Sequence, residues 1–248
     1  MEDIVMKEDK DLLFLAKCQN DDLRTLCDIL THNKQGELRF SEQLSNTDAY
    51  LNCYPEKMNL MAKEISEEFR KFGSNTVHTL YKKGEADSYE TILRRVCKKL
   101  KVSVAYNDNV NMMEQRLLTT LCEKTTEKLS DEELRDLADK AGISHKNLNR
   151  QQIVFSLMIS LRTNRYLFVE LMTFIITRIA NMIFGRTISM MGMITFERYV
   201  GMLAGPIGWG MLACWTISDI ASPAYRVVIP AVIMIAGMRY RHVELSEA

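Results

Sequence analysis

The sequence predicts an all-α protein, a multi-helix globule in which amphipathic N-terminal helices surround an apolar C-terminal helical hairpin. Two observations lead to this fold class. Over the first 150 residues, apolar side chains recur at the three- and four-residue spacing of a helix face, and no stretch alternates polar and apolar residues as a half-buried strand does. Helix start and stop signals also separate these apolar stripes from one another.

Residues that favour helix ends mark the limits of the first three predicted helices. Residues 9–33 are expected to form two helices, with Asn20 and Asp21 as the N-cap of the second. A further helix is expected to begin at Pro55 and to end at Gly73. Proline suits a first helical turn and glycine suits a C-terminal end, so these two residues set the expected limits.

The segment 88–142 carries the clearest helix pattern. Two of its helices are expected to bury one apolar stripe each: Ile92, Val96 and Leu100 in the first, and Met113, Leu117, Leu121 and Cys122 in the second. Ser130 and Glu133 then have the spacing of a capping box, and Gly142 follows at the expected end of that third helix.

The composition divides the chain near residue 165. The 248 residues carry 32 basic and 32 acidic side chains, so the net charge is zero. Residues 166–248 hold only six of the basic residues, all Arg, and five of the acidic ones, together with seven of the 11 glycines. We therefore expect a charged helical region over 1–165, an apolar Met- and Gly-rich helical region over 166–248, and a hairpin at about 199–241.

The stretch Tyr199–Ser218 contains twenty residues without a charge. That length is enough for one helix to span the apolar part of a bilayer. Residues 220–238 would form the second arm of the hairpin, with Pro223 ending the helix before it and Pro230 kinking it. Basic residues flank both ends of the hairpin, which would keep both ends on the cytoplasmic side of a membrane: Arg198, Arg239 and Arg241.

Other features of the hairpin favour a protein core over a bilayer. Asp219 and Arg226 would lie at its deep end, where each charge costs about 2.5–3.5 kcal/mol in lipid. The two are seven residues apart, so they could pair in a folded globule. Gly201 and Gly205 permit close helix packing, and Trp209 lies inside the run, where it does not form an aromatic belt.

We infer from these features a buried hairpin in the soluble form of the protein, wrapped by the amphipathic N-terminal helices. Pore-forming colicins have this arrangement, and their hairpin can leave the shell and enter a bilayer. The comparison is an architectural analogy. The other interpretation is a stable soluble bundle whose last helices are simply very apolar.

Most enzymatic chemistry lacks support in the sequence. The four histidines are scattered, and no phosphate-binding glycine loop, nucleophile elbow or paired metal-ligand motif is present. The six cysteines contain no CxxC pair and are expected to be free thiols in a reducing cytoplasm. We therefore expect no catalytic residues, no cofactor and no metal, and the balanced charge gives no reason to expect nucleic acid as a partner.

One basic cluster, Arg94 to Lys101, allows two interpretations. It suits the negative end of a helix dipole, which is the interpretation that we favour. It would also help a peripheral protein to touch an anionic membrane, where each cation adds about 1 kcal/mol. The chain opens with MEDIVMKEDKD, which has no signal-peptide pattern, so we expect a cytoplasmic protein that can associate with the inner face of the membrane.

Several segments resemble the YaaW-like family of uncharacterised bacterial proteins. They include DLLFLAKCQNDDLRTLCDILTHNKQGELRFSEQL near the start and LAGPIGWGMLACWTISDIASPAYRVVIPAVIMIA near the end. Ser218 and Ser222 replace the small residue and the glycine expected there. The resemblance implies a bacterial source and one shared constellation: Gly205, Pro206, Asp219, Pro223, Tyr225, Arg226 and Pro230. Family members are sometimes labelled as related to ubiquinol–cytochrome c chaperones, and no activity is implied for individual residues.

Two functional classes remain open from the sequence. The first is a non-enzymatic protein that interacts with membrane lipid and can insert its hairpin, with Arg198, Asp219, Arg226, Arg239 and Arg241 governing depth and orientation. The second is a soluble interaction or assembly-chaperone protein, whose apolar segment is a buried core or an interface with a protein partner. The sequence sets no oligomeric state.

Overall fold

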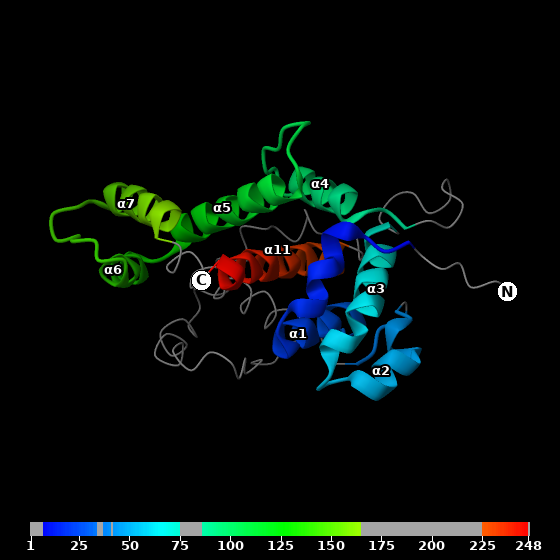
Figure 1. Ribbon diagram of the computed structural model, residues 1–248. Coiled ribbons are helices and arrows are strands. Elements are labelled where there is room, and N and C mark those ends of the chain that lie inside the picture. Colours follow the sequence, from blue (N-terminus) through cyan, green and yellow to red (C-terminus); the bar gives the residue numbers. More distant parts are fainter. Residues whose placement is uncertain (1–6, 34–36, 41, 75–85, 165–224, 248) are drawn as a thin grey trace.

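The computed structural model describes residues 7–33, 37–40, 42–74, 86–164 and 225–247, and its fold is all-α (Figure 1). The helices are η1 (Lys10–Lys17), α1 (Asn20–Thr31), η2 (Leu44–Asn46), α2 (Asp48–Cys53), η3 (Met58–Met61), α3 (Ala62–Ser74), α4 (Tyr89–Lys99), α5 (Val110–Lys128), α6 (Asp131–Lys140), α7 (Arg150–Thr163) and α11 (Tyr225–Glu247). Within these residues the chain forms no strand, and β-type pairing is limited to one bridge between His32 and Leu38.

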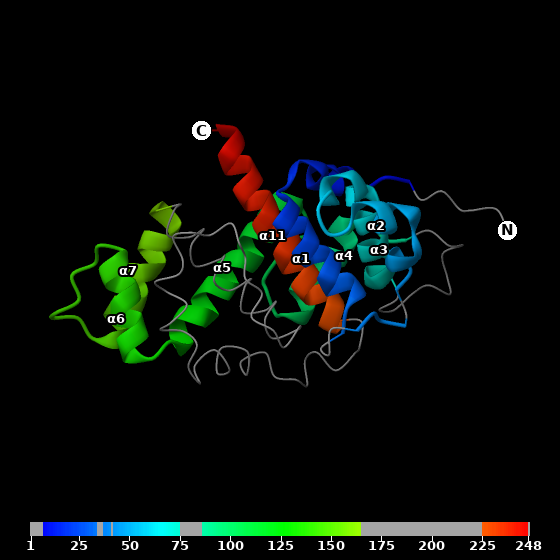
Figure 2. The ribbon, with the colours of Figure 1, turned by 90° about the horizontal axis from the view of Figure 1, so that it is seen from below.

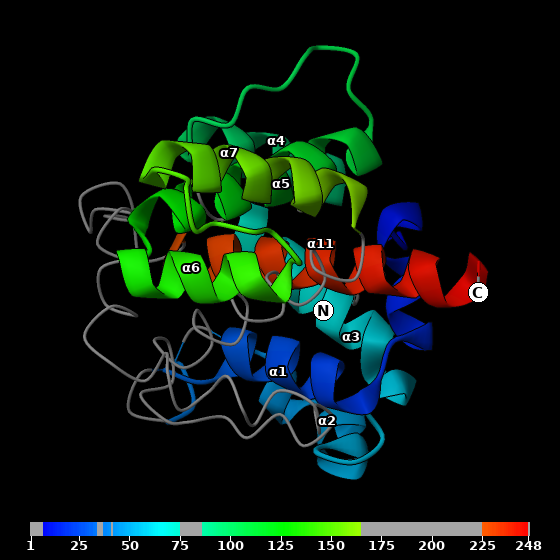
Figure 3. The ribbon, with the colours of Figure 1, turned by 90° about the vertical axis from the view of Figure 1, so that its left-hand side faces the viewer.

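Helix α11 is the central helix of the fold. It lies between a layer that contains α4 and α5 and a layer that contains α1, α2 and α3 (Figure 3). Every residue from 227 to 238 is buried, so this segment is apolar on all of its faces, as expected for a helix surrounded by others. Burying one large aliphatic side chain contributes about 1.5–3 kcal/mol, so α11 supplies a major part of the core.

The core does not follow the change in composition at residue 165. The buried side chains of α11 form one cluster with those of α1, α3, α4 and α5, which lie in the charged region of the sequence. The helix also runs past residue 241, where the hairpin was expected to end, and continues to Glu247. It continues through the buried Pro230, whose nitrogen cannot donate the usual bond to the carbonyl of Arg226.

The expected N-cap at Asn20 and Asp21 is wrong by one residue. Helix α1 begins at Asn20 with Gln19 as its N-cap, and no side chain caps it. The Asn20 side chain instead holds a distant turn. Its Nδ2 donates to the carbonyl of Pro55 at 3.0 Å, and its Oδ1 accepts from the amide of Met58 at 2.8 Å.

The helix expected from Pro55 to Gly73 is shorter at one end and longer at the other. Pro55 lies in the turn held by Asn20, and the regular helix α3 begins only at Ala62. Gly73 lies inside α3 and does not end it. A Cβ at Gly73 would be 2.4 Å from Cδ1 of the buried Ile92, so this glycine permits close approach of α3 and α4.

The expected helices between residues 88 and 142 are confirmed. The stripe residues Ile92, Val96, Met113, Leu117, Leu121 and Cys122 are all buried. Ser130 and Glu133 form the expected capping box at the start of α6. Helices α6 and α7 pack on each other around a small second core and lie beyond the end of α5 (Figure 1).

Candidate functional site

Arg239, in the C-terminal half of α11, makes polar contacts with two other elements of the fold. Arg239 Nε donates to Glu114 Oε2 at 2.8 Å, and its Nη2 donates to the carbonyl of Asp11. The guanidinium also lies 4.1 Å from the ring centroid of Phe14. Three elements, namely α5, η1 and α11, are therefore joined through this one side chain.

Glu114 is the buried acceptor at the centre of these contacts. Its second oxygen, Oε1, accepts from the Tyr89 hydroxyl at 2.6 Å. Burial raises the pKa of Glu114 above its ordinary value, although Arg239 acts in the opposite direction. Burial and the neighbouring Glu114 carboxylate raise the pKa of Tyr89 well above its ordinary value. Both oxygens of Glu114 have internal donors, so the geometry is that of a structural contact.

A second arginine of α11 pairs with a buried carboxylate on the other side of the helix. Arg241 Nη2 lies 3.0 Å from Oδ1 of Asp22 on α1. Burial raises the pKa of Asp22, and Arg241 opposes that rise. Figure 2 shows α11 between α1 and α5, so the two arginines fasten it to neighbours on both sides.

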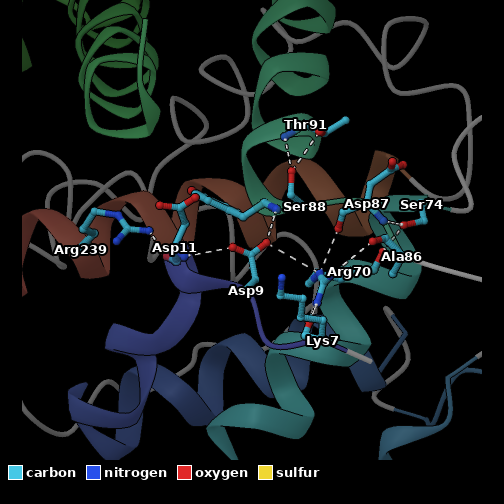
Figure 4. A network of polar contacts seen from close by, with 11 residues as sticks. Lys7, Asp9, Asp11, Arg70, Ser74, Ala86, Asp87, Ser88, Thr91 and Arg239 are labelled. Carbon is cyan, nitrogen blue, oxygen red and sulfur yellow. Dashed lines mark hydrogen bonds and ion pairs between the residues drawn. The ribbon is translucent and has the colours of Figure 1, made fainter. Parts of the chain in front are cut away.

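An adjoining network ties the N-terminal segment to α3 and α4 (Figure 4). Asp9 Oδ2 accepts from the Tyr89 amide at 2.6 Å, and its Oδ1 accepts from the Asp11 amide at 3.0 Å. Arg70 lies 3.8 Å from Asp9 and donates to three backbone carbonyls, including that of Lys7 at 2.6 Å. Asp9 thus lies between Arg70 on one side and Arg239 on the other (Figure 4).

Sequence reasoning missed Glu114, Asp22, Tyr89, Asp9 and Arg70. A signal for two of them was present. Glu114 lies on the apolar face of α5 between Met113 and Leu117, and Asp22 directly precedes a buried run in α1. A carboxylate on an apolar helix face requires a buried partner, and arginines of an apolar helix could supply one.

The pocket beside this cluster is small. It has a volume of about 240 Å³ and lies between α5 and α11, with walls that include Asn111, Glu114, Gln115 and Arg239. Typical small-molecule sites occupy roughly 300–1,000 Å³. Its two charged residues already pair with each other, so the pocket offers no free charge to a ligand.

Cys18, Cys27, Cys53, Cys97 and Cys122 are free thiols, as the sequence predicts for these five. Burial raises the pKa of Cys18 to about 12 and that of Cys97 to about 11, so little reactive thiolate forms at neutral pH. In the described ranges, no three His, Cys, Asp or Glu side chains gather as metal ligands.

The sequence-predicted site residues divide into two groups. Seven lie outside the described residues: Arg198, Gly201, Gly205, Pro206, Trp209, Asp219 and Pro223. The other five lie on α11: Tyr225, Arg226, Pro230, Arg239 and Arg241. Of these five, Arg239 and Arg241 are paired inside the bundle, Pro230 is buried and Arg226 is exposed.

The exposure of Arg226 bears on its predicted pairing with Asp219. The pair itself stays a prediction, because Asp219 lies outside the described residues. An exposed arginine is solvated with or without a partner, so such a pair would contribute only about 0–1 kcal/mol.

The N-terminal end of α11 meets the C-terminal end of α4. Lys99 Nζ lies 5.6 Å from the ring centroid of Tyr225. Lys98 and Lys101, on either side of Lys99, are exposed, and so is Arg226 beside Tyr225. Among the described residues, none of these three exposed cations has an ion-pair partner. We name Lys98, Lys101 and Arg226 the cationic patch.

The two arginines of the basic segment have internal partners. Arg94 donates to the carbonyls of Ala105 and Asp108 at 2.9 and 3.0 Å. Arg95 pairs with Asp87 at 2.8 Å. The segment therefore contains structural arginines as well as lysines that suit the helix dipole, and only its C-terminal lysines project as exposed charge.

Lys101 has an unusual backbone conformation for a lysine. Helix α4 ends in a Schellman motif, in which Val102 N donates to the carbonyl of Cys97 at 2.8 Å and Lys101 N to that of Lys98 at 3.2 Å. Lys101 takes the left-handed position of that motif, with φ of 57°. A non-glycine residue there costs about 1–2 kcal/mol. Helix α6 ends in the same motif with Gly142 at the equivalent position.

None of the helices in the described part of the chain combines the length and low charge needed to cross a membrane. Helix α11 has the length, but it carries three arginines within Tyr225–Arg241.

The described residues form an all-α bundle in which buried ion pairs hold the central helix α11 to its neighbours. The chain belongs to the UPF0174 family. It is 34 % identical to a UPF0174 protein of Helicobacter pylori strain J99, over 97 % of this chain and 95 % of the relative.

Further comparisons agree with this membership. The chain is 26 % identical to the UPF0174 protein YaaW of Escherichia coli strain K12, over 93 % of this chain and 94 % of that protein. Residues 6–40 match a domain of unknown function, DUF3944. No solved structure matches the chain significantly. The YaaW-like resemblance seen in the sequence is confirmed.

Proposed function

We propose that this protein is a non-enzymatic, membrane-interacting helical protein whose bundle is a head that stays outside the lipid. One observation carries the proposal. The uncharged stretch Tyr199–Ser218 ends seven residues before Tyr225, the first residue of α11, and α11 is already buried within the head. Because α11 is fixed in the head, the end of the uncharged stretch must stay close to the head. The stretch itself could then contact lipid while the head remains outside it.

The position of α11 argues against insertion of the whole 199–241 hairpin as a unit. Removing α11 would expose the buried run from residue 227 to 238 and break the pairs of Arg239 and Arg241. Each large apolar side chain brought out into water costs about 1.5–3 kcal/mol, and an unpaired buried carboxylate adds several more. Contact through the uncharged stretch alone avoids these costs. We expect the head to lie on the cytoplasmic side.

The alternative is a soluble interaction or assembly-chaperone protein. The burial of α11 favours it, because this apolar helix is accounted for as core without any lipid. In that case the uncharged stretch would pack in the protein or against a protein partner.

Tryptophan fluorescence separates the two functions. The chain contains two tryptophans, Trp209 and Trp215, and both lie within Tyr199–Ser218. The full-length protein would be mixed with vesicles that contain bromine-labelled lipid and then floated on a gradient. We expect co-flotation that resists carbonate, together with quenching of the tryptophan emission.

Two controls define the test. Vesicles without bromine should float with the protein and leave its emission unquenched. A protein that stays at the bottom of the gradient at pH 7 and pH 5, with unquenched emission, would exclude the membrane function and favour the soluble one.

A further inference from the structure

We infer that the cationic patch of Lys98, Lys101 and Arg226 is a docking surface for anionic lipid headgroups. The inference rests on the proposed membrane function and adds to it which face of the head meets the membrane and which lipid chemistry that face recognises.

Arg226 of the cationic patch lies close in the chain to the uncharged stretch Tyr199–Ser218. The patch is assembled from two segments more than a hundred residues apart, which meet at the Lys99–Tyr225 contact of 5.6 Å. Tyr225 is also where α11 begins, seven residues after the end of the uncharged stretch at Ser218. An extended chain of that length spans at most about 25 Å. Lipid that contacts Ser218 is therefore within reach of the patch.

A further amino group lies near the cationic patch. Lys124, on α5, donates to the carbonyl of Leu100 at 3.1 Å, which adds another amino group at this end of α4. The opposite end of α11 differs, because its arginines are paired with Glu114 and Asp22. Exposed, unpaired cations are the groups that anionic headgroups attract.

Lys101 of the cationic patch has a strained backbone conformation. Its φ of 57° is a conformation that glycine adopts without strain, as Gly142 does at the end of α6. Compared with glycine, a lysine at such a position makes the fold less stable and adds an exposed positive charge. Residues in strained conformations are concentrated at functional sites, and here the charge is the property that the lysine gains over glycine.

The test is binding of the full-length protein to two kinds of vesicle, one of phosphatidylcholine alone and one of phosphatidylcholine with phosphatidylglycerol. The variant Lys98→Gln/Lys101→Gln/Arg226→Gln would be compared with the wild type and with Lys10→Gln/Lys57→Gln/Lys146→Gln. The control removes three exposed lysines from other elements and has the same net charge. A duplex DNA is the competing polyanion.

We expect the patch variant to bind phosphatidylglycerol vesicles about a hundredfold more weakly than wild type, roughly fivefold for each charge, and the control to bind like wild type. The difference should shrink at high salt because exposed charges are screened. Lys101→Gly alone should bind about fivefold more weakly and yet unfold at a higher temperature, which separates lost binding from lost folding.

The other outcomes would overturn the inference in distinguishable ways. Equal binding of the wild type and the patch variant, with tryptophan quenching in both, removes the docking surface and leaves the membrane function intact. No binding of the wild type to either vesicle removes both. Loss of DNA binding in the patch variant, with unchanged vesicle binding, would assign the patch to nucleic acid.

Discussion

The two ends of α11 carry the same residue type in opposite situations. At the C-terminal end, Arg239 and Arg241 pair with buried carboxylates on α5 and α1. At the N-terminal end, Arg226 is exposed next to the lysines of α4. The C-terminal end of α11 is therefore held in the bundle by ion pairs, and we call it the fastened end. The N-terminal end has an arginine that is exposed to solvent, and we call it the exposed end. An arginine beside an apolar helix says little about function until its partners are known.

The largest expected effect concerns the fastened end. Arg239→Ala leaves the Glu114 carboxylate buried with only the Tyr89 hydroxyl, and it removes the contacts to Phe14 and to the Asp11 carbonyl. We expect a loss of about 3–5 kcal/mol in the free energy of unfolding, measured by urea denaturation. Arg226→Ala is the matched control at the other end, with an expected change within about 0.5 kcal/mol. Equal losses in the two variants would contradict the comparison.

Arg241→Ala should have the next largest effect. Its partner Asp22 is buried, but the arginine itself is 20 % exposed, so water can reach part of the pair. We expect a loss of about 1–3 kcal/mol in the same assay. Asp22→Asn/Arg241→Ala should recover part of that loss, because it leaves no buried charge behind. A double variant less stable than the single would show that the pair is not the source of the effect.

The pH dependence follows from the raised pKa of Glu114. The folded protein holds this proton more tightly than the unfolded chain, so the contribution of Glu114 to stability falls as the pH rises above the ordinary value of 4.5. Protonation of Glu114 near pH 5 should therefore not detach α11 from the bundle. In Glu114→Gln the fall in stability between pH 5 and pH 7 should be smaller than in wild type. An identical slope in both proteins would show that Glu114 titrates at its ordinary value.

The smallest effect concerns the exposed end. Lys101→Gly removes the cost of a lysine in the left-handed conformation, but glycine loses more conformational entropy on folding, about 0.5–1 kcal/mol. The net effect should be a stabilisation of about 0.5–1 kcal/mol, seen as a higher midpoint of thermal unfolding. Gly142→Lys makes the reverse change at the end of α6 and should destabilise by a similar amount. No space restricts that position, since nothing lies within 4 Å of an added Cβ. A destabilised Lys101→Gly variant would show that the lysine side chain contributes to the fold.

Local features of the fold could be predicted from the sequence. The capping box at Ser130 and Glu133 and the apolar stripes of α4 and α5 depend on residues a few positions apart, and the structure has them as expected. The start of α3 could not be predicted in this way. Pro55, where the sequence pattern places the start, lies instead in a turn that Asn20 holds from 35 residues away, and α3 begins after it at Ala62.

The pairing of the arginines at the C-terminal end of α11 could not be predicted for the same reason. Arg239 and Glu114 are 125 positions apart, and the residue pattern of one helix does not indicate which residue of the other it contacts. The sequence therefore placed Arg239 and Arg241 at a membrane border, a reasonable role for arginines that flank an apolar run. Three-dimensional packing brings each of them to a carboxylate.

Hydrogen exchange along α11 tests the central claim most directly. In the full-length protein without lipid, we expect amides in the run from residue 227 to 238 to be protected to nearly the same extent as the buried amides of α5, because both belong to one core. In Arg239→Ala the protection of α11 should fall more than in Arg226→Ala. Rapid exchange of α11 in the wild type, with α5 still protected, would contradict its place as the central helix of the bundle.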